Sequence, residues 1–384
     1  MKLLEEKMEK HKITIVGNGL TGLTTALILG KLDIQINLIG NFKNKKNQKD
    51  CRTTAISPIN YNFLIKFLES NNSKHFWPSK KINLYYEDSD RYSNFMNFDN
   101  KGQNIMYTIK NSKFREIVLK KIKKNKKIKI INNEVKKIDE KRSIVYSKNK
   151  KINSDIILLC VGSRSELIRK LIGQRIVYNN FNEVAFTATV KHDLNINSPK
   201  QYFLKEGPLA ILPLNSKEFS LVWSVSKNHN LEMMKTLIET RLKKILAFKK
   251  SINISKIDFF PITFKFNSNF LKKNVLVLGE GLYNIHPVAG QGFNLIIRDI
   301  KELDREIFDH LSLGLQIKDS LLLNKFMLSR KPENLLFGLG VSFIHKFLQN
   351  NKVTNPIKKM VLKDINKLDF LKNISLNFAN KGIF

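Results

Sequence analysis

The stretch Ile13-Thr14-Ile15-Val16-Gly17-Asn18-Gly19-Leu20-Thr21-Gly22 decides the fold. Its first four residues form a β-branched run typical of a buried strand, and the apolar residues 23–32 that follow have helical periodicity. Residues 34–39 predict a second strand. Glycines placed between strand and helix in such a βαβ unit are the signature of a dinucleotide-binding fold.

Each glycine of this turn has its own physical role. Gly17 permits the tight turn, Gly19 lets the backbone approach a pyrophosphate, and Gly22 lets the helix pack closely on the sheet. The helix N-terminus near Leu20 then presents free N–H groups and a partial positive charge to the phosphates. We therefore predict that Gly17, Gly19, Leu20 and Gly22 bind a cofactor, in preference to a glycine-rich turn that binds nothing.

The end of the second strand departs from this signature. An acidic residue is expected there to accept hydrogen bonds from a ribose, but the chain has Gly40 and Asn41. Asn41 can make one such bond, less strongly than a carboxylate, and we include it among the predicted cofactor-binding residues.

The composition indicates a globular chain rather than a nucleic-acid binder. With 384 residues, 42% of them hydrophobic, the chain can fill one large core or two interlocked domains. The formal charge of +34 is spread along the chain and carried mainly by lysine, whereas dedicated nucleic-acid proteins concentrate charge on one face and use arginine. We expect no nucleic-acid partner and attribute the charge to compositional bias. Attraction to anionic lipid, about 1 kcal/mol per basic residue near the surface, stays open.

Two features of the sequence bear on location and metal chemistry. Cys51 and Cys160 are the only cysteines, and no His or Cys residues cluster at metal-ligand spacing, so we expect neither a disulfide nor a metal site. The first twelve residues mix Glu with Lys, unlike a signal peptide, and no uninterrupted apolar run of about 18 residues follows. We expect a cytoplasmic protein without a membrane span.

Hydrophobic patterns indicate further strands and helices along the chain. Strands are expected in 74–110, 123–151 (on the surface), 155–160, 176–262 (except 231–249) and 274–278. Helices are expected in 111–122, 166–171, 231–249 and from about 311 to 384. A first strand at residue 13 and a last strand near residue 277, with a β-rich insert between them, imply a discontinuous cofactor domain.

Five motifs occur in a characteristic order. They are Gly17-x-Gly19-x-x-Gly22, Asp50-x-Arg52, Gly207-Pro208-Leu209-Ala210-x-Leu212-Pro213, Gly279-Glu280, and His286-Pro287-x-Ala289-Gly290-Gln291-Gly292-x-Asn294. Over nearly the whole chain, this set resembles the flavin-dependent hydroxylases of ubiquinone biosynthesis. The segment 286–294 is the most specific, Arg298-Asp299 continues it, and residues 330–334 resemble the helical tail of the same family.

The resemblance implies an α/β fold like that of para-hydroxybenzoate hydroxylase and other aromatic-ring hydroxylases. A Rossmann-like FAD-binding domain is expected over residues 1–75, 101–175 and 270–320. A β-sheet substrate domain over 76–100 and 176–269 is inserted into it, and a helical C-terminal segment covers 321–384.

The resemblance also implies roles for individual residues toward FAD. Arg52 would lie beside the ribityl and pyrophosphate region, and Gly279-Glu280 stands where the family usually has Gly-Asp, whose carboxylate contacts the ribityl chain. The loop that ends at the helix near Phe293 would line the flavin ring, with the helix N-terminus aimed at the pyrimidine edge. The cofactor-binding residues expected in this loop are Pro287, Ala289, Gly290, Gln291, Gly292, Phe293 and Asn294, and the catalytic ones are His286, Pro287 and Gly290. His286 can act as an acid or base or simply pack near the flavin, and both readings stay open.

The reaction implied is hydroxylation of the aromatic ring of a polyprenylated phenol. NAD(P)H would reduce the flavin, dioxygen would supply the inserted oxygen atom, and the protein would orient the ring and exclude water. Four side chains of the β-rich segment are candidates for the substrate wall, although each fits a core role as well: Phe186, Phe203, Leu212 and Trp223.

Three departures from the family pattern leave alternatives open. Val161 replaces the usual Asp, Gly40 replaces the acid, and Gly281-Leu282-Tyr283 replaces Ala-Ala-His. They leave open a non-catalytic paralogue that scaffolds a ubiquinone-biosynthesis complex, or a flavin dehydrogenase or reductase. Peripheral contact with the inner face of the membrane through residues 337–348 and 365–371, and a homo-oligomer, are also left open.

Overall fold

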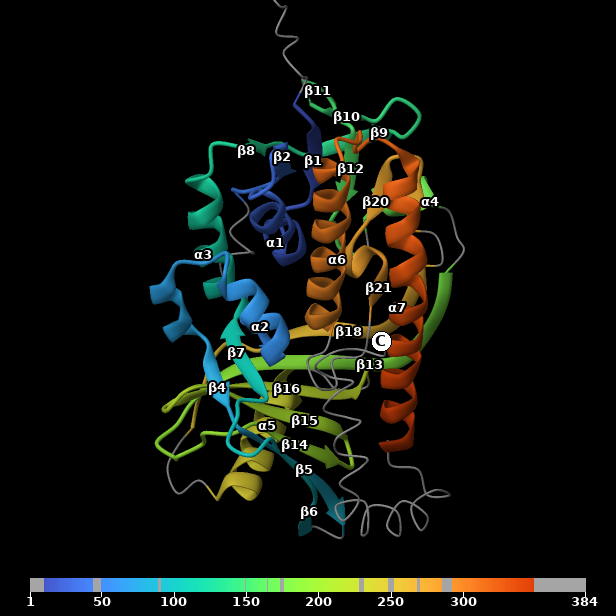
Figure 1. Cartoon of the computed structure of the whole chain (residues 1–384). Coiled ribbons are helices and arrows are strands. Elements are labelled where there is room, and N and C mark those ends of the chain that lie inside the picture. Colours follow the sequence, from blue (N-terminus) through green and yellow to red (C-terminus); the bar gives the residue numbers. More distant parts are fainter. Residues whose placement is uncertain are drawn as a thin grey trace, which may run out of the picture.

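The fold has two large sheets, one above the other in Figure 1, with two long helices running along one side. The computed structural model describes residues 10–43, 50–88, 91–148, 150–163, 165–172, 176–227, 231–247, 252–267, 270–284 and 292–348.

The upper sheet contains six strands in the order β19-β20-β12-β1-β2-β8. Neighbours from β20 to β8 pair in parallel, and β19 is antiparallel to β20. The strands are β1 (Lys12–Val16), β2 (Gln35–Gly40), β8 (Ile128–Asn132), β12 (Ile156–Leu159), β19 (Leu271–Lys272) and β20 (Val275–Val277). Every residue of β12 and β20 is buried, which explains why these strands read as unbroken apolar runs.

Helices pack around this sheet. They are α1 (Leu20–Leu29), α3 (Asn111–Lys123), α4 (Glu166–Ile172), α6 (Gly292–Ser312) and α7 (Ser320–Leu348). In α3, Phe114, Ile117, Val118 and Ile122 recur at helical spacing and are buried, while lysines occupy exposed positions. Helix α6 packs against both α1 and α7, and so joins the first described helix to the last.

The lower sheet contains nine strands, in the order β21-β18-β13-β16-β15-β14-β5-β6 with β17 paired to β13. They are β5 (Lys81–Asp88), β6 (Arg91–Asp99), β13 (Ile176–Lys191), β14 (Lys200–Leu204), β15 (Gly207–Asn215), β16 (Glu218–Ser226), β17 (Asn253–Ile254), β18 (Asp258–Asn267) and β21 (Tyr283–Asn284). Helix α5 (Leu231–Leu246) covers one face, where Phe219, Leu221 and Trp223 of β16 share a core with Met234 and Ile238.

Two small sheets and three short helices complete the described part of the chain. One sheet contains β9 (Val135–Asp139), β10 (Ile144–Ser147) and β11 (Lys150–Asn153), and the other contains β3 (Thr53–Ile56), β4 (Trp77–Ser79) and β7 (Met106–Lys110). The short helices are α2 (Pro58–Ile65), η2 (Ser70–His75) and η3 (Gly279–Gly281).

These elements confirm most of the predicted secondary structure. Helices α3, α4 and α5 match those predicted over 111–122, 166–171 and 231–249. The expectation of surface strands throughout 123–151 is wrong for β8, which joins the parallel sheet because Ile128 and Ile131 are buried beside β2.

The predicted helical tail corresponds to α7 as far as Leu348. Phe337, the first residue of the segment 337–348 for which membrane contact was left open, is fully buried in the core. The side chains of residues 341–348 and the whole of 365–371 lie outside the described part of the chain.

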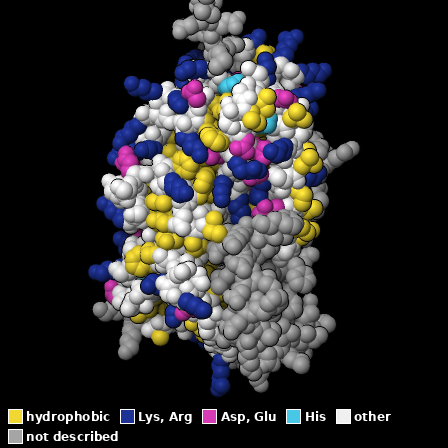
Figure 2. Space-filling model, viewed as in Figure 1, with side chains coloured by type: hydrophobic (Ala, Val, Ile, Leu, Met, Phe, Trp, Pro, Cys, Tyr) yellow, Lys and Arg dark blue, Asp and Glu magenta, His cyan; other side chains and the backbone are white. Residues whose placement is uncertain are grey.

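The described residues contain neither a membrane-spanning helix nor a metal cluster. No described helix is both long and apolar enough to cross a bilayer. No three His, Cys, Asp or Glu side chains of the described part gather closely enough to hold a metal ion. Figure 2 shows lysine and arginine side chains scattered over the described part of one face, consistent with charge spread along the chain.

Candidate cofactor site

The turn between β1 and α1 is shaped by backbone contacts that only glycine tolerates. A Cβ atom on Gly17, whose φ is +125°, would lie 2.1 Å from the carbonyl oxygen of Cys160. A Cβ on Gly22 would lie 2.0 Å from the carbonyl oxygen of Gly17. Gly19 differs, because a Cβ there would meet no atom within 4 Å. Gly17 and Gly22 are therefore required by packing, and Gly19 faces open space.

The N-terminus of α1 is available to an anion. Its N-cap is Gly19, which offers no side-chain hydrogen bond, and the first turn, which includes Leu20, holds no acidic residue. The unpaired N–H groups and the positive end of the helix dipole can thus act on a ligand that occupies the space beside Gly19.

The missing acid at the end of β2 has a packing explanation. A Cβ on Gly40 would lie 2.7 Å from the Cβ of Asn18, so the side chain of Asn18 occupies the space that a larger residue 40 would need. The Asn18 Nδ2 donates a hydrogen bond of 2.6 Å to the carbonyl oxygen of Asn41. Asn18 thereby joins the glycine turn to the end of β2, a link that motif reasoning missed.

Arg115 is a second residue that motif reasoning missed. It lies on α3, its side chain is buried, and its guanidinium donates a hydrogen bond to the carbonyl oxygen of Asn18. Burial lowers the pKa of Arg115, and the charge of Asp50 opposes that shift. The detectable signal is a charged residue within the apolar pattern of α3, between Phe114 and Ile117.

Arg52 lies where the upper half of the molecule meets the lower sheet. Its Nε and Nη2 donate to the two carboxylate oxygens of Asp50 at 2.9 and 2.8 Å, and its guanidinium carbon lies 4.9 Å from the centre of the Phe260 ring of β18. Burial opposes the charged form of Arg52, but hydrogen bonds to Asp50 and the charges of Asp50 and Glu280 raise its pKa. The motifs Asp50-x-Arg52 and Gly279-Glu280 therefore act on each other electrostatically.

The Gly279-Glu280-Gly281 turn lies against the first turn of α1. Gly279 has a φ of +79°, and a Cβ on it would lie 2.7 Å from the Oγ1 of Thr21. The side chain of Glu280 is exposed. This contact joins two glycine turns from opposite ends of the sequence.

Val161 lies beside the same turn. A Cβ on Gly281 would approach the Val161 carbonyl oxygen to 3.0 Å and the Cδ1 of Ile168 to 2.3 Å. The position where the family usually has Asp is thus packed against the second glycine turn through its backbone, and its side chain supplies no charge.

The loop expected to line the flavin ring falls mostly outside the described residues. This applies to His286, Pro287, Ala289, Gly290 and Gln291. The loop lies between two described elements, β21 before it and α6 after it, and both are anchored by buried hydrogen bonds.

Asn294 anchors the start of α6. Its Oδ1 accepts hydrogen bonds from the backbone N–H of Ser57 at 2.8 Å and from Asn60 Nδ2 at 2.9 Å, while its Nδ2 donates to the Ala55 carbonyl at 2.9 Å. Because the side-chain amide of Asn294 is buried in these contacts, any contact of Asn294 with FAD would be made by its backbone. Gly292 and Phe293, half-buried in the same first turn, stay predictions.

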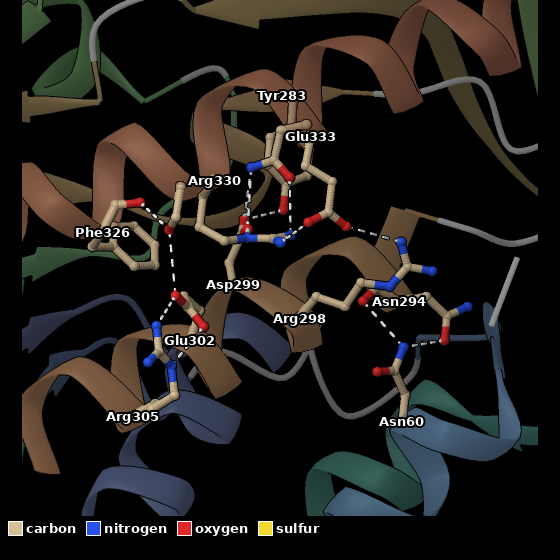
Figure 3. A network of polar contacts seen from close by, with 12 residues as sticks. Asn60, Tyr283, Asn294, Arg298, Asp299, Glu302, Arg305, Phe326, Arg330 and Glu333 are labelled. Carbon is tan, nitrogen blue, oxygen red and sulfur yellow. Dashed lines mark hydrogen bonds and ion pairs between the residues drawn. The ribbon is translucent and has the colours of Figure 1, made fainter. Parts of the chain in front are cut away.

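Asp299 connects α6, α7 and β21 (Figure 3). This fully buried carboxylate accepts hydrogen bonds from Tyr283 Oη at 2.5 Å, Arg330 Nε at 2.7 Å and Asn334 Nδ2 at 3.1 Å. Arg330 also pairs with Glu333. Burial and the charge of Asp299 raise the pKa of Tyr283 well above its usual value, so Tyr283 stays a neutral donor. The sequence motifs at 298–299 and 330–334 therefore join β21, α6 and α7, which are described elements on either side of the loop.

The candidates for the substrate wall divide between the two faces of the lower sheet. Phe186 and Trp223 are buried in the core that contains α5, and Phe203 in a smaller cluster under β5 and β6. These three side chains are therefore core residues rather than part of a substrate wall. Leu212 is half-buried and alternates along β15 with core residues, so it lies on the opposite face.

That opposite face of the sheet meets the upper half of the molecule. Thr187 and Asp258 contact Cys51, whose Sγ lies 3.2 Å from Thr187 Oγ1 and 3.1 Å from Asp258 Oδ2. Burial raises the pKa of Cys51 to about 11, the hydrogen bond from Thr187 opposes this, and Asp258 adds to it. Cys51 is therefore a neutral thiol at physiological pH. Ala185, next to Phe260 in register, and Ser224 continue this face with small side chains.

One protein family matches half of the chain. The sequence model described as "Glucose inhibited division protein A" matches residues 86–279. This range covers most of the lower sheet together with β12 and β20, but it includes neither the turn at Gly17–Gly22 nor the segment 286–294. The family match and the glycine motifs are thus separate observations.

Relatives extend over the whole chain. The "Ubiquinone biosynthesis monooxygenase COQ6, mitochondrial" of Dictyostelium discoideum is 22% identical, covering 97% of this chain and 91% of the relative. The "3-demethoxyubiquinol 3-hydroxylase" of Escherichia coli K12 is 24% identical over 48% of this chain and 45% of its own length.

Solved structures show the fold. The p-nitrophenol 4-monooxygenase PnpA of Pseudomonas putida DLL-E4 superposes with a TM-score of 0.78, at 15% identity and 96% coverage of both chains. HpxO of Klebsiella pneumoniae, complexed with FAD and uric acid, has a TM-score of 0.75 at 13% identity and 97% coverage of both chains. The predicted fold, an FAD-binding domain with an inserted sheet, is confirmed.

Proposed function

We propose a function from one premise: the chain belongs to the family described as Glucose inhibited division protein A, and its motifs and relatives place it among the flavin-dependent hydroxylases of ubiquinone biosynthesis. It is an FAD-dependent monooxygenase that hydroxylates the aromatic ring of a polyprenylated phenol, with NAD(P)H and dioxygen as co-substrates. The contact between Gly279 and Thr21 carries this proposal, because it brings two distant glycine turns to one uncapped helix N-terminus.

The residues present fit FAD in an extended form. The open space beside Gly19 and the free N-terminus of α1 suit a pyrophosphate. Arg52 and Glu280, coupled by charge, would face the ribityl region, where Arg52 would use the donors that it does not direct at Asp50. The loop 286–292 would line the ring, with His286, Pro287 and Gly290 nearest the reacting atoms. FAD, when bound, supplies the activation of dioxygen, for which protein side chains alone have no suitable chemistry.

The substrate would lie between the upper half and the lower sheet. On that side the sheet offers Ala185, Thr187 and Ser224, which are small, together with the Phe260 ring. A flat phenol needs room more than charge, so small side chains beside an aromatic ring suit it. These residues would orient the ring and exclude water, and no protein nucleophile is needed.

The proposed substrate also bears on location. A polyprenyl chain resides in the bilayer, so we propose a cytoplasmic protein in peripheral contact with the inner face of the membrane. Assembly with other ubiquinone-biosynthesis proteins or with a second copy of the chain belongs to the same proposal.

The test is an oxygen-labelling experiment on the full chain reconstituted with FAD. Purified protein receives a prenylated phenol, NAD(P)H and ¹⁸O₂, and mass spectrometry follows the product. One ¹⁸O atom on the ring for each NAD(P)H consumed is the expected result. Oxidation of NAD(P)H with no label in the product would favour a reductase, and a protein that does not take up FAD would favour a scaffold. Either outcome contradicts the proposal.

A further inference from the structure

Two hollows adjoin on the surface formed by α1, α3 and residues 66–75, away from the cofactor site. The first has a volume of about 160 Å³ and is lined by polar and basic side chains, among them Lys74, His75, Lys120 and Lys121. The second, about 230 Å³, is lined largely by apolar side chains, among them Leu27, Phe67, Leu68, Ile122 and Ile128. Lys121 lines both hollows, so they adjoin at this residue, and we call the two together the trough.

The first hollow has an excess of positive charge. Its two acidic residues are already paired, Glu69 with Lys124 at 2.7 Å and Glu116 with Lys113 at 3.0 Å. Lys74, Lys120 and Lys121 have no ion-pair partner among the described residues. Three cations thus remain for an external anion.

Polar groups around these lysines add hydrogen-bond donors. The amides of Asn71 and Asn72 line the same hollow. Burial, together with the charges of Lys113 and Lys74, lowers the pKa of His75, so its ring is neutral near pH 7 and keeps one N–H donor. Lysine cations together with neutral donors suit a phosphate ester, which accepts several charge-assisted hydrogen bonds.

The second hollow indicates that the anion carries a hydrocarbon part. The half-buried ring of Phe67 lines this hollow, and its exposed part gains free energy when covered by apolar groups rather than by water. Pockets for a complete small molecule usually measure about 300–1,000 Å³, so each hollow suits only one part of a ligand.

We propose that this trough binds the phosphate headgroup and the first carbons of an anionic phospholipid, and so docks the protein on an anionic membrane. This proposal rests on the proposed function, which includes peripheral membrane contact, and it names the surface that makes that contact. Its test measures binding without turnover, so the docking face and the hydroxylation can fail separately.

The first experiment compares two triple variants of the FAD-loaded full chain in vesicle flotation. K74Q/K120Q/K121Q removes the free cations of the trough. K136Q/K137Q/K150Q removes three exposed lysines from β9 and β11 as a control of equal charge. Vesicles contain phosphatidylcholine alone, which gives a neutral surface, or phosphatidylcholine with roughly 30 mol% phosphatidylglycerol, which gives an anionic surface.

Binding is expected only with phosphatidylglycerol. Each basic residue near an anionic surface contributes about 1 kcal/mol, so the trough variant should bind about 100-fold more weakly. The control variant should lose less than about threefold. Equal losses in both variants would mean that the charge of the whole molecule drives binding, and no loss in the trough variant would exclude the site. Unchanged flavin content in both variants confirms that they are folded.

A second experiment separates a lipid from free phosphate. Dihexanoyl-phosphatidylglycerol, kept monomeric, and inorganic phosphate are compared as competitors of vesicle binding at constant ionic strength. The lipid should release the protein at a concentration at least about tenfold lower, because its chains cover the second hollow. Equal potency would make the trough a site for free phosphate and would overturn the proposal.

Discussion

The two glycine turns that meet beside α1 are held by different kinds of contact. At the first turn, the atoms that leave no room for a Cβ on Gly17 or Gly22 are those of backbone carbonyl groups. After the second turn, β21 and α6 are held by hydrogen bonds of buried side chains, above all Asp299 and Asn294. The conformation of the first turn follows from a local sequence motif, whereas the elements that follow the second turn depend on residues that are far apart in sequence and meet only in the folded chain.

The largest effect is expected from breaking the side-chain anchor of the second turn. The variant Asp299→Ala leaves Arg330 and Asn334 buried without the carboxylate that they bind. Loss of one partner of a buried ion pair costs about 3–5 kcal/mol. The free energy of unfolding, measured by urea denaturation, should fall by that amount. The control Asp309→Ala removes a half-exposed partner of Arg305 and should cost less than about 1 kcal/mol. Equal costs would mean that the buried carboxylate of Asp299 does not anchor the elements that follow the second turn.

Alanine variants of the first turn should separate packing from cofactor binding. In Gly22→Ala the new Cβ meets the Gly17 carbonyl, which should lower the free energy of unfolding by about 1–3 kcal/mol even without FAD. In Gly19→Ala the Cβ enters open space, so stability should change by less than about 1 kcal/mol while the Kd for FAD rises about tenfold. Urea denaturation and fluorescence titration with FAD measure the two effects. A normal FAD affinity for Gly19→Ala would contradict the proposed position of the pyrophosphate.

Arg115 extends the comparison, because it supports the first turn with a side chain. Arg115→Met removes the donor to the Asn18 carbonyl, and a hydrogen bond from a charged group is worth about 1.5–3 kcal/mol. If half of that stabilises the FAD-bound turn, the Kd for FAD should rise about 4- to 13-fold. Arg115→Lys should recover part of the affinity, since lysine keeps a charged donor without the fork. An unchanged Kd for Arg115→Met would mean that backbone contacts alone hold the turn.

The smallest effect is expected at Cys51, which joins the first half of the chain to the lower sheet. Cys51→Ser should change the free energy of unfolding at pH 7 by less than about 1 kcal/mol, because the thiol makes only weak hydrogen bonds. The raised pKa of about 11 means that the folded protein keeps the thiol proton at a pH where the unfolded chain loses it. Wild-type stability should therefore fall, relative to the variant, as the pH rises from 9 toward 11. Parallel curves over this range would contradict the assigned environment.

Local patterns were sufficient to predict much of the fold. The β1–turn–α1 unit, the buried strand β12 and the amphipathic helix α3 follow from residue order alone, because their side chains meet neighbours close in sequence or a continuous core. Strand β8 was placed on the surface because lysines surround it, and only its pairing with β2 reveals Ile128 and Ile131 as core residues.

The candidate site was only partly predictable. The roles of Gly17 and Gly22 in packing follow from the motif, but the occupation of the Gly40 position by Asn18 does not, since it depends on two strands meeting. The hydrogen bond from Arg115 joins residues 97 positions apart. Contacts of this kind carry no periodic signal, and a single sequence offers no other evidence for them.

The central claim is that both glycine turns contact one FAD molecule, and hydrogen–deuterium exchange with and without FAD tests it most directly. Peptides covering residues 15–25 and 277–296 should both become protected on addition of FAD, with the same dependence on FAD concentration. Protection confined to one of the two peptides would contradict the claim.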